Sequence, residues 1–186
     1  MEILTYLIGV LLGLSLTAPP GPVNSIISVE SVRSKIHGSS VGAGAMTADI
    51  IFFIIVYSFG NIVPKSALYA LYIVGSIVMF YFAYSTLKKS SRYKTRRGNY
   101  FVGLLVGISN PFQIIWWVTA GLFVVNHMSL IGVFGLFSGV VLWITIFPFF
   151  VNKYAKRYEK YVRIASSVVL ISFGVYILIV GIKVIL

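Results

Sequence analysis

Long apolar stretches separated by short polar connections dominate the chain. Six of these stretches are close to the roughly 20 residues that a bilayer core requires. They cover residues 3–31, 40–59, 67–87, 100–125, 130–151 and 162–182. The pattern predicts an all-α, polytopic membrane protein with six transmembrane helices. It leaves no room for a separate soluble domain, so residues 1–186 form a single transmembrane domain.

The first and fourth apolar stretches are interrupted by proline. Pro-Pro-Gly-Pro occupies positions 19–22 and is followed by Asn24, and the fourth stretch contains Asn110-Pro111 followed by Gln113. Proline and glycine release backbone groups that hydrocarbon cannot satisfy, so such breaks persist only inside protein or beside a polar cavity. Corresponding breaks in the two halves of a membrane protein indicate a transport site near the bilayer midplane.

The charged residues are few and unevenly placed. There are 15 Lys and Arg against 4 Asp and Glu, which gives a formal net charge of +11. Thirteen of the 15 lie in the connections between the first and second, third and fourth, and fifth and sixth stretches, or directly at their edge, as Arg163 does. The positive-inside rule therefore places these connections in the cytoplasm and both termini outside, in a cell membrane. Such clusters fit contact with anionic lipid heads, and we do not expect nucleic acid as a partner.

The two halves of the chain show a weak internal repeat. An offset of 91 residues lays Pro20 on Pro111 and Gly44 on Gly135. The order of basic and neutral connections is reversed between the halves. Three spans per half would make the halves antiparallel, so we predict a 3+3 inverted repeat, residues 1–93 and 94–186, with broken helices 1 and 4. Glycines four residues apart should let neighbouring helix backbones approach closely.

Asp49 is the one acidic residue well inside a predicted span, whereas Glu2, Glu30 and Glu159 lie at ends or connections. An unpaired carboxylate near the bilayer centre costs at least about 2.5–3 kcal/mol on insertion scales, so it usually faces a cavity or a partner. Two interpretations stay open. Asp49 is either a proton-coupling or amine-binding group, or a structural carboxyl that is hydrogen-bonded to a helix break.

Other residue types point away from enzymatic or metal chemistry. The chain has no cysteine, which excludes disulfides and cysteine-ligated metals. His37 and His127 lie in predicted connections, and no nucleotide-binding or hydrolase motif is present. We therefore expect no cofactor, no metal site and no enzyme. Trp116, Trp117 and Trp143 lie near mid-depth, where core packing is favoured over a cavity wall.

The sequence resembles the LysE/RhtB family of amino-acid exporters. The specific parts of the resemblance are the Pro-Gly-Pro at 20–22, Asn24 and Asn110-Pro111, and the similarity extends over essentially the whole chain. It implies efflux of amino acids or related small metabolites, driven by an ion gradient or the membrane potential. Many members carry a basic residue where this chain has Phe112, and an extra proline precedes the triplet.

Together these features predict a secondary transporter that exports amino acids or related small amine-bearing solutes by alternating access at a mid-membrane site. H+ is the candidate coupling ion, and a homo-oligomer is the candidate assembly. A non-transporting membrane subunit and a passive channel are the alternatives. The expected substrate and ion pathway comprises Pro20, Gly21, Pro22, Asn24, Asp49, Asn110, Pro111 and Gln113.

Overall fold

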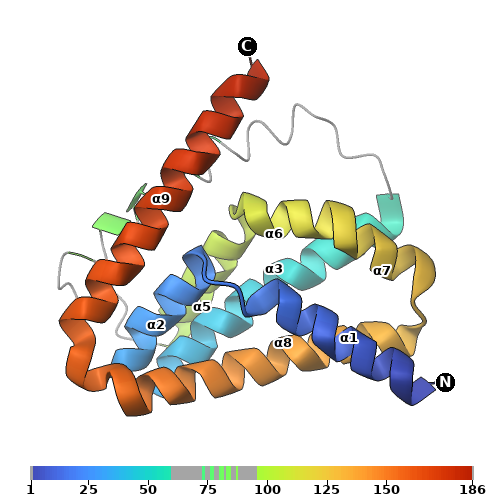
Figure 1. Cartoon of the computed structure of the whole chain (residues 1–186), viewed down its shortest axis with the longest axis horizontal. Helices are drawn as coiled ribbons and strands as arrows, with labels where there is room; N and C mark the ends of the chain where they lie inside the picture. Colours follow the sequence, from blue (N-terminus) through green and yellow to red (C-terminus); the bar gives the residue numbers. More distant parts are fainter. Residues whose placement is uncertain are drawn as a thin grey trace.

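A computed structural model describes residues 2–59, positions 73, 76, 77, 80, 81, 83, 84 and 87, and residues 96–185. All regular secondary structure in these residues is helical (Figure 1), as the apolar pattern predicts. The expected third span, 67–87, lies largely outside the described residues. In chain order the elements are α1 (Glu2–Thr17), α2 (Pro22–Arg33), α3 (Lys35–Phe59), α5 (Arg96–Ile108), α6 (Pro111–Trp116), the π-helical turn η1 (Trp117–Gly121), α7 (Leu122–His127), α8 (Leu130–Phe150), the π-helical turn η2 (Val151–Ala155), the 3-10 turn η3 (Lys156–Tyr158) and α9 (Glu159–Ile185).

Both proline breaks lie where the sequence places them. α1 ends at Thr17 and α2 begins at Pro22, and the two helices are bent by 81°. α5 ends at Ile108, and Pro111 opens α6. Proline is tolerated at the first position of a helix because its missing N–H would have no intrahelical partner there. The same chemistry therefore ends one helix and starts the next in each half.

The lengths and apolar surfaces of the helices are those of a multi-pass membrane protein. Within the described residues, Lys35–Phe59 and Leu130–Ala155 are long and apolar enough to cross a bilayer, and the bent pair α1–α2 adds a third span if it counts as one. Side chains such as Ile3, Leu7 and Leu11 on α1 are exposed. In a bilayer such surfaces contact lipid, where they cost nothing to expose.

One predicted connection is much shorter than expected. The sequence leaves residues 32–39 between the first and second spans, but α2 ends at Arg33 and α3 begins at Lys35. Only Ser34 separates them, with extended backbone angles φ −160° and ψ 131°. Polar residues can continue a helix beyond the hydrocarbon core, where water satisfies their side chains, so hydropathy does not locate a helix end there. His37 therefore lies in the first turns of α3 and not in a loop.

Close helix pairs connect the two halves of the chain. α1 lies along α8, and α3 lies along α5 (Figure 1). A Cβ atom added to Gly44 would collide with the backbone oxygen of Tyr100, and one added to Gly139 would collide with that of Val10. The glycines therefore let the paired backbones touch, which confirms their predicted packing role.

Candidate functional site

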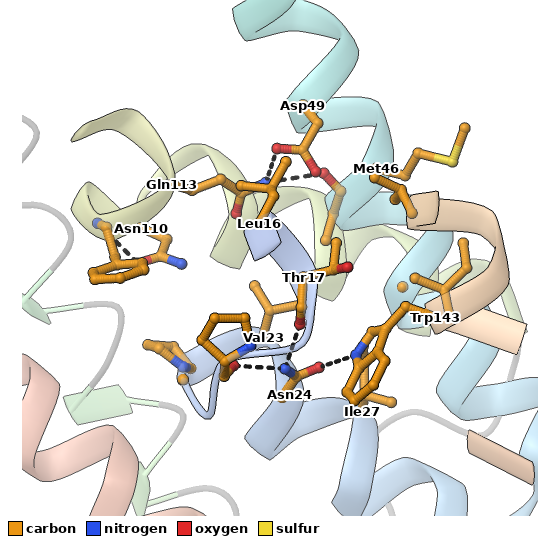
Figure 2. A pocket seen from close by; sticks show the side chains of 18 of the residues that line it. Leu16, Thr17, Val23, Asn24, Ile27, Met46, Asp49, Asn110, Gln113 and Trp143 are labelled. Atoms are coloured by element: carbon orange, nitrogen blue, oxygen red, sulfur yellow. Dashed lines mark hydrogen bonds between the residues drawn. The ribbon is translucent and has the colours of Figure 1, made fainter. Parts of the chain in front are cut away.

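The two broken helices meet at a cavity between α1, α2, α3, α6 and α8, which we call the central cavity (Figure 2). Its volume is about 50 Å³, and it is partly open to the exterior. Seven of the eight predicted pathway residues line it: Pro20, Gly21, Pro22, Asn24, Asp49, Asn110 and Gln113. The eighth, Pro111, begins α6 beside them. The structure thus brings together residues from both halves of the sequence.

Asp49 lies on α3 at the wall of the central cavity and is only 2% exposed. Its Oδ1 atom accepts hydrogen bonds from Gln113 Nε2 at 2.6 Å and from Trp117 Nε1 at 2.8 Å. The described residues that line the cavity include no Lys, Arg or His. Amide and indole N–H groups, and no cation, therefore stabilise the carboxyl group, as the absence of a basic residue in the spans predicts.

The second donor to Asp49 was not expected. The sequence favours core packing for Trp117, and the side chain is indeed 1% exposed and packed in the apolar core. Its indole nitrogen nevertheless needs an acceptor when it is buried. Trp117 follows Gln113 by four residues, so both side chains lie on one face of the helical segment. That spacing is the sequence signal that points both donors at one acceptor.

Asn24 joins the break in the first helix to α8. Its Nδ2 donates to the carbonyl oxygens of Thr17 at 2.6 Å and Pro19 at 2.8 Å. Thr17 is the last residue of α1 and Pro19 lies in the break, where the helix ladder is interrupted and carbonyl groups need other donors. Its Oδ1 accepts from Trp143 Nε1 at 3.1 Å. Trp143 lines the central cavity, so the expectation of core packing was wrong for this side chain.

The two helices that follow the breaks begin differently. Asn110 Oδ1 accepts from the N–H of Phe112 at 3.2 Å, which confirms the capping interpretation of Asn110. α2 starts after Gly21, which has no side chain and provides no cap. The N–H groups of Val23 and Asn24, in the first turn, have no intrahelical acceptor. The start of α2 therefore keeps donors and a positive dipole end for an anionic group at the cavity.

Glu30 is more deeply placed than the sequence indicates. It lies near the end of α2 remote from the cavity and is 7% exposed. Its Oε2 atom is 3.7 Å from Arg33 Nη1. This pair is local, at positions i and i+3, and does not reach the central cavity. Within the part of the chain that the structure describes, no three His, Asp or Glu side chains are grouped closely enough to hold a metal ion.

The sequence is similar to a known family and to a curated relative. Residues 14–186 match the model of the family described as LysE type translocator, and this range includes both breaks. The chain is 32% identical over 160 residues to YcgF of Bacillus subtilis (strain 168), whose given name proposes amino acid efflux, and the match covers 74% of this chain and 76% of YcgF. No solved structure shows a significant match to the chain. The chain belongs to the LysE type translocator family.

Proposed function

We propose that the chain is a secondary transporter that exports amino acids or related small amine-bearing solutes across the cell membrane. The observation that carries this proposal is the central cavity, which is lined by both the buried carboxyl of Asp49 and the uncapped start of α2. The name of the relative YcgF, which proposes amino acid efflux, supports the class of solute. Export as the direction of transport follows from the family.

The cavity offers complementary partners for a zwitterion. Asp49 accepts the hydrogen bonds from Gln113 and Trp117 through Oδ1. Its second carboxyl oxygen, Oδ2, takes part in neither bond. A solute ammonium group can bind this second oxygen, since a charge-assisted hydrogen bond is stronger than a neutral one. The carboxylate of the same solute can accept from the N–H groups at the start of α2. Leu16, Met46 and Val140 supply apolar wall for the rest of the molecule.

Reciprocal glycine contacts support an inverted repeat. Gly44 lies against the carbonyl of Tyr100, and Gly139 lies against that of Val10. Tyr100 follows Val10 by 100 − 10 = 90 residues, and Gly139 follows Gly44 by 139 − 44 = 95 residues. The same two intervals relate a second pair of contacts: Gly103 against the Val41 carbonyl, and Gly13 against the Leu136 carbonyl. These contacts pair Gly44 with Gly139. The sequence-based pairing with Gly135 has the same kind of support, because Gly135 lies against the Tyr6 carbonyl and Gly9 against that of Gly132, with intervals of 135 − 44 = 91 and 100 − 6 = 94 residues.

We place the repeats at residues 1–93 and 94–186 of one transmembrane domain, with alternating access as the repeats rock about the cavity. Arg33 is the last residue of α2, Lys35 is the first of α3, and Lys153 lies in η2, which follows α8. Figure 1 shows these helix ends gathered away from the N-terminus. We assign this basic end to the cytoplasm, near anionic lipid heads, and both termini to the outside. H+ is the proposed coupling ion, because Asp49 can take up and release a proton at the cavity.

Uptake of labelled amino acids into inverted membrane vesicles tests the function. We expect saturable uptake of at least one amino acid, and its loss in D49N. The matched control is I54L on the same helix, because Ile54 is 54% exposed and faces away from the cavity. Uptake by D49N at the normal rate would sink the role given to Asp49. A passive channel would show uptake that does not saturate. A non-transporting subunit would show no uptake of any amino acid and would be purified in a stable hetero-complex.

A further inference from the structure

A second cavity adjoins the central cavity and shares part of its wall. Its volume is about 280 Å³, and it is largely open on one side. Four residues line both cavities: Pro20, Gly21, Asn24 and Trp143. The two spaces are therefore separated by the break in the first helix and by the indole of Trp143.

The second cavity extends from this shared wall toward the basic end of the molecule. On α2 it reaches from Asn24 to Ser28, in the direction of Arg33. On α8 it reaches from Trp143 to Phe147, in the direction of η2 and its Lys153. It therefore lies between the central cavity and the end of the protein that carries the basic residues.

The contact that closes the shared wall is a single hydrogen bond between two helices. Trp143 Nε1 on α8 donates to Asn24 Oδ1 on α2 at 3.1 Å. The indole stacks on Phe147 with ring centroids 5.0 Å apart and planes at 10°. An indole has only this one polar donor, and a single neutral hydrogen bond contributes little net stability. The contact can therefore open without disrupting the rest of the packing.

The opposite side of the central cavity carries an equivalent contact. Asn24 follows Pro22 by two residues, and Gln113 follows Pro111 by two residues. Asn24 bonds to Trp143 on α8, whereas Gln113 bonds to Asp49 on α3. Figure 2 shows the two contacts on opposite sides of the residues that line the cavity. Each broken helix therefore contacts the second helix of the other half through its first polar side chain after the break.

We infer that Trp143 and Asn24 form a gate between the two cavities, and that the second cavity is the vestibule through which a solute passes between the central cavity and the basic end. The passage of an amino acid through this gate rests on the proposed function. The gate itself is defined by two cavities and one contact, so it can be tested without any solute. The two proposals can fail separately. A protein that takes up no amino acid but restricts thiol labelling would contradict only the proposed function, and a protein that takes up amino acids but does not restrict labelling would contradict only the gate.

Thiol accessibility tests the gate directly, because the chain has no cysteine of its own. Met46→Cys places one reporter in the central cavity, and Ser28→Cys places another in the vestibule. Inverted membrane vesicles present the proposed cytoplasmic end to a charged, membrane-impermeant methanethiosulfonate. In the background of wild-type Trp143 we expect S28C to react at least about tenfold faster than M46C, because the closed gate excludes the reagent.

Variants at Trp143 then open the gate. W143F removes the N–H donor and keeps most of the ring, and the loss of one neutral hydrogen bond should raise the M46C rate about fivefold. W143A removes the ring as well, and the increase should reach at least about tenfold. The S28C rate should stay unchanged in both backgrounds. The matched control is W116F, because Trp116 lines neither cavity.

Three outcomes would overturn the gate. The first is an M46C rate that equals the S28C rate with Trp143 intact. The second is an M46C rate that W143F and W143A leave unchanged. The third is an increase that appears only when the reagent is added at the opposite membrane face. If W143A does not fold, W143F decides the question, because it preserves the stacked ring. An unchanged S28C labelling rate in the W143F background shows that this variant is folded.

Discussion

Replacing Asp49 by leucine or by asparagine should separate its effect on stability from its effect on transport. Its Oδ1 atom is the acceptor for two buried donors, Gln113 Nε2 and Trp117 Nε1. D49L leaves the indole N–H without this acceptor, which costs about 1–3 kcal/mol. Gln113 keeps a longer hydrogen bond to the carbonyl of Ala45 at 3.3 Å. The loss of its bond to Asp49 should therefore cost only about 1 kcal/mol of stability. The expected destabilisation is therefore about 2–4 kcal/mol.

This loss is large enough to measure. For a chain of this length, 1 kcal/mol shifts the midpoint of thermal unfolding by about 2–4 °C, so D49L should lower it by about 4–16 °C. D49N offers an amide oxygen in place of Oδ1 and should lose only about 1 kcal/mol. The assay is thermal unfolding of the detergent-solubilised protein, followed by tryptophan fluorescence. As a control, S138A removes a hydroxyl that bonds only to Phe134 O in its own helix, and it should stay within about 0.5 kcal/mol of wild type.

The two variants give separate ways to refute the reasoning. A D49L midpoint equal to that of wild type would show that the two hydrogen bonds do not stabilise the fold. A D49N protein that is as stable as wild type and also exports normally would show that the carboxyl group has no part in solute binding or coupling. The expected result for D49N is a loss of only about 1 kcal/mol in stability together with a loss of transport.

The remaining predictions concern packing, capping and topology. G44A should destabilise the protein by about 1–3 kcal/mol through overpacking against α5, whereas G21A should not, because the nearest atom to its added Cβ is Pro19 O at 3.9 Å; equal unfolding midpoints would contradict this. N110A should lose about 0.5–2 kcal/mol as a lost cap, and N110D, which keeps the acceptor, should unfold near the wild-type midpoint. Alkaline phosphatase fused to the C-terminus should be active outside the cell, and the same enzyme fused after Lys153 should be inactive; the reverse pattern would invert the proposed orientation.

The breaks could be predicted from the sequence because proline acts locally. A proline removes its own N–H and disturbs the carbonyl one turn earlier, whatever surrounds it. The positions of the ends of α1 and α5 follow from that chemistry alone. The convergence of the two breaks on one cavity was expected only from their correspondence in the two halves. The structure adds the cavity itself and its walls.

The hydrogen-bond partners could not be predicted in the same way. Gln113 and Asp49 are 64 residues apart, and Trp143 and Asn24 are 119 apart, so no local pattern connects them. The need of Asp49 for an uncharged donor followed from the lack of basic residues in the spans, but the identity of the donors did not. Hydropathy assigns tryptophan to packing, and it is silent on where the indole N–H finds its acceptor.

The interval between the proposed repeats shows a limit of another kind. Gly44 can be aligned with Gly135 or with Gly139, because small residues recur every four positions in both helices. A shift of one turn keeps the same helix face and the same pattern, so residue identity does not distinguish the two. The backbone contacts do not distinguish them either, because Gly135 touches the carbonyl of Tyr6 in the same way as Gly139 touches that of Val10.

The two contacts beside the central cavity occupy matching places but differ in chemistry, and this difference bears on directional transport. One joins Asn24 to Trp143 and carries no charge, so it responds to packing and to the approach of a solute, but not to a proton. The other joins Gln113 and Trp117 to Asp49, where an ammonium group or a proton competes with both donors for the carboxyl oxygens. An inverted repeat with identical contacts would open equally on both sides. Under the proposed function, a carboxyl on one side alone would let solute binding and proton coupling act on that side, while the contact between Trp143 and Asn24 on the other side would open without a change of charge.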